Sequence, residues 1–209
     1  MGFLANSVLS LGAAGVGSAA YGLVEAQAFT TRRLTLNVLP TGSAEIRVLH
    51  ISDLHITPAQ TRKINWVKSL AKLEPDFVVG TGDFLAHQLA VPAVVEAMDE
   101  LMDLPGAFVL GSNDYFAPHL KNPFTYFRKD RQIRAEGESL PTEDLVEQLT
   151  DAGWLDLNNK QGSISINGVT VHARGTDDPH IRKDDYTSVA GAFNANSFAL
   201  GVTHAPYKR

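Results

Sequence analysis

The segment EIRVLHISDLH, residues 45–55, joins an apolar run to a cluster of polar residues. The run from Glu45 to Ser52 has the length and apolar content of a buried strand. It ends directly in Asp53-Leu54-His55, so that a carboxylate and an imidazole follow the strand without a linker. This pattern predicts a strand whose carboxyl end carries groups able to bind a ligand.

Two later segments repeat this arrangement. Residues 76–81 (DFVVGT) run into Gly82-Asp83, and residues 107–110 (AFVL) run into Gly111-Ser112-Asn113-Asp114. In each case an apolar strand-like run is again followed at once by polar residues. The chain therefore carries three strands that we expect to end in chemically useful side chains.

Segments with helix-like spacing of apolar residues, 60–73 and 91–102, separate the three strands. Strands alternating with helices predict a parallel sheet whose carboxyl ends lie along one edge. Asp53, Asp83 and Asn113 follow the strands at equal intervals, so we expect them to lie close together.

The C-terminal part predicts antiparallel strands. Residues 163–172 (SISINGVTVH) alternate apolar and polar side chains on either side of Asn167-Gly168, a strong hairpin signal. Residues 197–203 (SFALGVT) read as one more strand, which is followed by His204. The predicted fold class is α/β, with mixed sheets and βα repeats flanked by helices.

The N-terminal segment differs from the rest. Residues 2–24 contain no charged residue, a length that can span a bilayer as a helix. We predict an apolar anchor at residues 1–28, or alternatively a flexible or interfacial leader, and a linker at residues 29–44. Arg32 and Arg33 follow the apolar run, which favours a cytoplasmic catalytic side for a membrane-associated protein.

The composition excludes several classes of protein. The chain has 209 residues, a net charge of -5 and no cysteine. No global basic field exists to hold nucleic acid, so we expect no stable nucleic-acid partner. Any metal ion must be bound by His, Asp, Glu or Asn, a donor set that suits Mn, Fe or Zn. A bridging Asp would permit two ions, a common arrangement for phosphoryl transfer.

Four motifs in order resemble the calcineurin-like metallophosphoesterase family, whose signature is D-x-H, G-D, G-N-H-D/E, G-x-x-H and a final G-H-x-H. They are Asp53-Leu54-His55, Gly82-Asp83, Gly111-Ser112-Asn113-Asp114 and Gly201-Val202-Thr203-His204. The resemblance covers residues 46–209. The apolar leader is similar to that of the anchored bacterial members.

The resemblance implies that Asp53 and His55 bind a first divalent metal ion and that Asp83 bridges it to a second. It further implies that His204 binds the second ion, and that a bridging hydroxide attacks phosphorus. The expected cofactors are two ions of Mn, Fe or Zn. The expected substrate is a phosphorylated small molecule or a lipid-linked one.

The third motif departs from the family pattern. Ser112 stands where the family has its metal-binding Asn, and Asn113 stands where it has the proton-donating His. We expect Asn113 to reach the second ion through its amide oxygen, with Ser112 as the alternative ligand. An amide cannot act as a general acid near neutral pH, so the catalytic acid is unassigned. The missing acid should slow hydrolysis least for substrates with good leaving groups, such as a phosphodiester or a pyrophosphate.

The final G-H-x-H is absent, since the chain stops at Arg209. We expect a fragment whose domain, residues 45–209, is incomplete at its C-terminus and lacks its last strands. The alternative is a non-catalytic metal-binding or regulatory domain. A nuclease shares the chemistry, but only residues 121–134, a basic and aromatic loop, offer it a positive surface.

Arg174 and His180 lie in the turn-rich stretch after the hairpin. The stretch is typical of a structural loop, and the alternative prediction is that Arg174 or His180 contacts the substrate.

Overall fold

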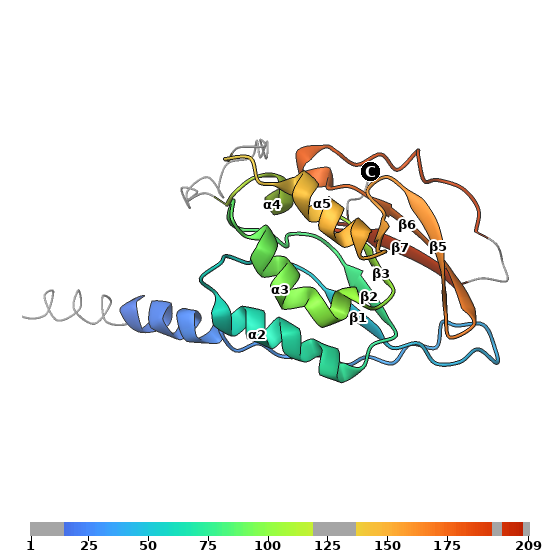
Figure 1. Cartoon of the computed structure of the whole chain (residues 1–209), viewed down its shortest axis with the longest axis horizontal. Helices are drawn as coiled ribbons and strands as arrows, with labels where there is room; N and C mark the ends of the chain where they lie inside the picture. The colour runs from blue at the N-terminus through green and yellow to red at the C-terminus, as the bar shows by residue number, and fades with distance from the viewer. Residues whose placement is uncertain (1–14, 119–136, 194–197, 207–209) are drawn as a thin grey trace, which may run out of the picture. The chain divides into compact units, whose positions relative to one another are not determined.

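The computed structural model of the chain describes residues 15–118, 137–193 and 198–206 (Figure 1). The predicted basic loop at 121–134 lies outside the described residues.

The chain forms two compact units, residues 1–36 and 37–209. Residues 15–25 of the first unit are helical. Within the described part of the chain, no helix combines the length and hydropathy needed to cross a membrane. The prediction of a transmembrane helix therefore finds no support there, and the rest of the predicted anchor at 1–28 lies outside the described residues.

A four-stranded parallel sheet forms the centre of the second unit. Its strands are β1 (Val48–Ile51), β2 (Phe77–Gly80), β3 (Gly106–Phe108) and β4 (Leu155–Asp156), in that order across the sheet (Figure 1). The three predicted strands and their parallel pairing are confirmed. The fourth strand has only two residues, too few for a sequence pattern to reveal.

Helices connect these strands. The predicted helix at 60–73 is α2 (Thr61–Ser69), extended by a 3₁₀ turn at Leu70–Leu73, and α3 (Val91–Met102) has the predicted bounds. Two further helices were not predicted: the short α4 (Ser112–Tyr115) and α5 (Thr142–Asp151).

The second sheet contains three strands. The hairpin is confirmed as β5 (Gln161–Ile166) and β6 (Val169–Thr176), which pair antiparallel across Asn167-Gly168. Both turn residues have positive φ, 50° and 79°, as a two-residue hairpin turn requires. The final strand, β7 (Phe198–Thr203), pairs parallel with β6. A short 3₁₀ turn (Pro179–Ile181) follows β6.

The two faces of the parallel sheet bury different partners. On β2, Val78 packs with the helices α2, α3 and α5, whereas Phe77 and Val79 pack against the second sheet at residues such as Val171 and Val202. This alternation is the period of a strand that is buried on both faces. The result is a pair of packed sheets with helices on the other face of the parallel one (Figure 1), which confirms the predicted fold class.

Candidate metal centre

The loops that leave β1 and β2 run side by side beyond the ends of the strands. The Asp53 amide donates to the Gly82 carbonyl at 3.0 Å, and the His55 amide donates to the Asp83 carbonyl at 2.8 Å. Asp53, His55 and Asp83 all have positive φ, 54°, 43° and 56°. Such left-handed backbone is costly for residues with a side chain, and it concentrates at functional sites.

These loops bring the first three predicted ligands together. The Nε2 atom of His55 lies 3.9 Å from Asp53 Oδ1 and 3.5 Å from Asp83 Oδ2. A metal ion with bonds of about 2.1 Å can hold ligand atoms that are at most about 4.2 Å apart. His55 is therefore close enough to each carboxylate to share an ion with it, while the three residues whose ligand atoms all lie within 4.8 Å of one another are Asp53, Asp83 and His204.

His204 approaches the same carboxylate from the end of β7. Its Nδ1 donates to the Thr81 carbonyl at 2.6 Å, and its Nε2 lies 3.7 Å from Asp83 Oδ2. A histidine held at one nitrogen by a carbonyl presents the other nitrogen in a fixed direction, as metal-ligating histidines do. Burial lowers the pKa of His204, but the bond to Thr81 and the charges of Asp83, Asp178 and Asp53 outweigh it and raise the pKa.

Asn113 also contacts Asp83. Its backbone N–H donates to Asp83 Oδ1 at 2.8 Å, and its side-chain amide donates to Asp83 Oδ2 at 2.7 Å. The amide nitrogen thus faces the carboxylate, and binding of an ion through Oδ1 would require the amide to turn. The alternative ligand, Ser112, is the first residue of α4.

Gly111 makes room for these contacts. A Cβ atom at this position would lie 2.2 Å from Asp83 Oδ1 and 2.8 Å from His204 Cε1. No side chain fits between them, so glycine is required for Asp83 and His204 to approach each other.

Asp114 holds together the backbone of the two loops that carry Asp83 and Gly111, a role that was not predicted from the sequence. It is fully buried, and its carboxylate accepts hydrogen bonds from the backbone N–H groups of Gly111, Asp83, Phe84 and Leu85 at 2.7–3.0 Å. Burial raises its pKa to about 7, against the opposing effect of the donors. The only signal in the sequence was its place at the end of the third polar cluster.

The turn after β6 forms a second group of possible ligands. Asp178, His180 and His204 each have a ligand atom within 4.8 Å of the others. Asp178 is fully buried, and its Oδ1 accepts from the His180 backbone N–H at 2.8 Å and pairs with His180 Nδ1 at 2.9 Å. The structure thus brings the predicted His180 to the centre. Asp178 was missed, although it lies in the same turn-rich stretch.

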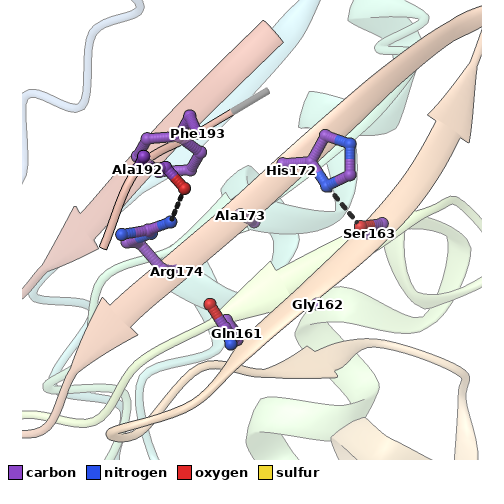
Figure 2. A pocket seen from close by; sticks show the side chains of 8 residues that line it. All are labelled: Gln161, Gly162, Ser163, His172, Ala173, Arg174, Ala192 and Phe193. Atoms are coloured by element: carbon purple, nitrogen blue, oxygen red, sulfur yellow. Dashed lines mark hydrogen bonds between the residues drawn. The ribbon is translucent and has the colours of Figure 1, made fainter. Parts of the chain in front are cut away.

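Arg174 lies elsewhere. On β6, Ala173 points into the core between the sheets, so Arg174 occupies the opposite face. Its guanidinium lies 3.6 Å above the Phe193 ring and donates to the carbonyls of Val189 and Gly191 at 2.8 Å. Figure 2 shows the pocket of about 460 Å³ that Arg174 lines on that face. Contact of Arg174 with the substrate stays a prediction.

Comparison with known proteins identifies a family over most of the chain. The sequence profile of the calcineurin-like phosphoesterases matches residues 46–208. Among solved structures, a phosphopantetheinyl hydrolase from Mycobacterium tuberculosis is similar at 16% identity and a TM-score of 0.37. The aligned region covers 61% of this chain and 41% of that one. No curated protein matches the chain.

Proposed function

Because the chain belongs to the calcineurin-like phosphoesterase family, we propose that it is a two-metal hydrolase of a phosphodiester or pyrophosphate bond. One observation carries the proposal. The Oδ2 atom of Asp83 lies close to two imidazoles, 3.5 Å from His55 Nε2 and 3.7 Å from His204 Nε2. A carboxylate in that position can bind two ions at once, one on the side of each histidine.

The donor set fits divalent ions of Mn, Fe or Zn, since it consists of carboxylate oxygens and imidazole nitrogens. Asp53, His55 and Asp83 would hold the first ion, and Asp83 and His204 would hold the second. When bound, such ions lower the pKa of water and neutralise charge on the phosphoryl oxygens. Gly111 and Asp114 keep Asp83 in place for this purpose through the close approach and the backbone hydrogen bonds described above.

Asn113 limits the range of substrates. It occupies a position beside Asp83 where its amide can donate a hydrogen bond but cannot release a proton near neutral pH. A leaving group that departs without protonation, such as a phosphate or an aryl oxide, avoids this limit. A pyrophosphate or an aryl phosphodiester, in a small molecule or a lipid-linked one, fits that description better than an alkyl phosphomonoester.

The test is hydrolysis of bis(p-nitrophenyl) phosphate by the full chain with Mn²⁺, compared with p-nitrophenyl phosphate. We expect turnover that prefers the diester and that Asp83→Asn lowers by at least about 10³-fold, because both ions lose a ligand. Asp151→Asn is the matched control, since it makes the same change at an exposed position on α5.

A non-catalytic metal-binding domain on the same fold is the second candidate, favoured by the amide of Asn113 at the position of the missing acid. It predicts Mn²⁺ binding that Asp83→Asn weakens, with no turnover of either ester by the unaltered chain.

A further inference from the structure

Only one of the two carboxylate oxygens of Asp178 has a hydrogen-bond partner among the described residues. The side chain is fully buried, and its Oδ1 is bonded to His180. Its Oδ2 is buried too and has no hydrogen-bond partner in the part of the chain that the structure describes. A buried carboxylate oxygen without a partner is unfavourable, because the charge loses its hydration and gains nothing in exchange. Such a group calls for a cation or a donor.

The surroundings of Asp178 point to a cation. A carboxylate oxygen of Asp178 and ring nitrogens of His180 and His204 lie within 4.8 Å of one another, close to the separation of about 4.2 Å that a single ion allows. Bringing the ligand atoms from 4.8 Å to this separation needs movements of less than about 1 Å, within the range of side-chain relaxation. Three donors of the types that Mn²⁺, Fe²⁺ and Zn²⁺ prefer therefore converge here.

His204 links this group to Asp83. The bond from its Nδ1 to Thr81 leaves Nε2 as the nitrogen that coordinates, so His204 can serve one ion only. That ion must be the one shared with Asp83 Oδ2, 3.7 Å away. His180 Nδ1 lies 2.9 Å from Asp178 Oδ1, so one ion can bind both residues through these atoms only by replacing the hydrogen bond between them.

We propose that Asp178 and His180 are additional ligands of the second metal ion, so that the turn after β6 completes a shell begun by Asp83 and His204. The inference rests on the proposed function, since it assigns further residues to the same metal centre. It gives the buried carboxylate of Asp178 a cation to bind, and it makes the second sheet a direct contributor to the site. The competing explanation is that Asp178 only caps the 3₁₀ turn through its bond to the His180 amide.

The experiment is calorimetric titration of Mn²⁺ into the metal-free full chain, together with thermal unfolding with and without Mn²⁺. The variants are Asp178→Asn, His180→Gln and the matched control Asp177→Asn. Asp177 is the adjacent buried carboxylate, but its Oδ2 is bonded to the Tyr115 hydroxyl at 2.7 Å and it belongs to neither ligand group. The control therefore removes the same charge one residue away.

We expect the unaltered chain to bind two ions. Asp178→Asn and His180→Gln should each weaken one of them by roughly 10- to 100-fold and leave the other unchanged, while Asp177→Asn binds both normally. The metal-free Tm of Asp178→Asn should equal or exceed that of the unaltered chain, because a buried carboxylate oxygen without a hydrogen-bond partner has been removed.

Two results would overturn the inference alone: normal binding of both ions by Asp178→Asn and His180→Gln, or a lower metal-free Tm of Asp178→Asn with normal binding. Absence of Mn²⁺ binding by the unaltered chain, or normal binding by Asp83→Asn, would instead overturn the proposed function and this inference with it. Because His180→Gln leaves the buried carboxylate intact, it keeps the test valid if Asp178→Asn does not fold.

Discussion

Two aspartates in the described part of the chain are buried completely, yet they differ in what they bind. Asp114, in the short helix α4 after β3, accepts hydrogen bonds from four backbone N–H groups, three in the segment after β2 and one at Gly111. Asp178, in the turn after β6, uses one oxygen and leaves the other without a partner among the described residues. The hydrogen bonds of Asp114 are satisfied within the protein, so Asp114 has a structural role. The carboxylate of Asp178 is satisfied only when a cation or another donor binds it. Burial alone therefore does not tell a supporting carboxylate from a ligand.

The largest expected effect concerns the satisfied aspartate. Asp114→Ala would leave four buried N–H groups without an acceptor, and we expect it to lower the free energy of unfolding by about 4 kcal/mol. Urea denaturation of the metal-free chain measures this change. Asp114→Asn keeps one acceptor oxygen and should cost less. A loss below about 1 kcal/mol for Asp114→Ala would show that Asp114 does not differ from Asp178 in the way described.

The next effect concerns the close approach of Asp83 and His204 at Gly111. Gly111→Ala places a Cβ 2.2 Å from Asp83 Oδ1, which must push the carboxylate away from His204. We expect Mn²⁺ affinity to fall by about 100-fold, the upper range for disturbed ligand orientation, as measured by calorimetry. Gly201→Ala is the control, since a Cβ there meets no atom within 4 Å. Equal affinities of the two variants would refute the need for this close approach.

A smaller effect is a pH dependence that belongs to Asp114. Its pKa is raised to about 7 in the folded protein, so the folded state holds a proton there that the unfolded state loses near pH 4. The stabilisation is complete below about pH 4 and is lost as the pH rises towards about 7, with a slope of at most about 1.4 kcal/mol per pH unit. Urea unfolding of the metal-free chain across this range, with Asp114→Asn subtracted, isolates the slope. An identical pH profile for the two proteins would contradict it.

The smallest effect concerns a third buried polar group. The Nε of Arg174 has no partner among the described residues, but its other nitrogens bind the carbonyls of Val189, Gly191 and Ala192 on the outer face of the second sheet. Arg174→Gln should cost about 1 kcal/mol of stability and leave kcat/KM on the aryl diester unchanged. A tenfold rise in KM without loss of stability would instead support the predicted contact with the substrate.

The fold was largely predictable where the local pattern was strong. The helix at Val91–Met102 and the turn at Asn167-Gly168 have the predicted positions, because apolar periodicity and turn chemistry act within a few residues. Helix α5 was not predicted, because its two fully buried leucines, Leu145 and Leu149, make too narrow an apolar stripe to stand out in the sequence. The two-residue strand β4 exists only through its pairing with β3.

The candidate site was predictable in part for the same reason. Asp53, Asp83 and His204 follow strands directly, and the structure places them within reach of one another. Asp178 carried no comparable signal, since an Asp-Asp-Pro turn is common and only its burial gives it meaning. Arg174 and His180 looked alike in sequence, yet Arg174 lies on the outer face of β6, whereas His180 lies in the turn after β6, close to His204.

The sequence by itself determined the chemical types of the ligands, their order and their attachment to strand ends, because these depend on residues that are adjacent in the chain. Only the tertiary structure decided which aspartate is satisfied and which is not, and that the turn at Asp178 and His180 meets the end of β7 at His204. Both outcomes depend on the packing of two sheets whose contacting residues are far apart in sequence. Local propensity carries no information about such contacts.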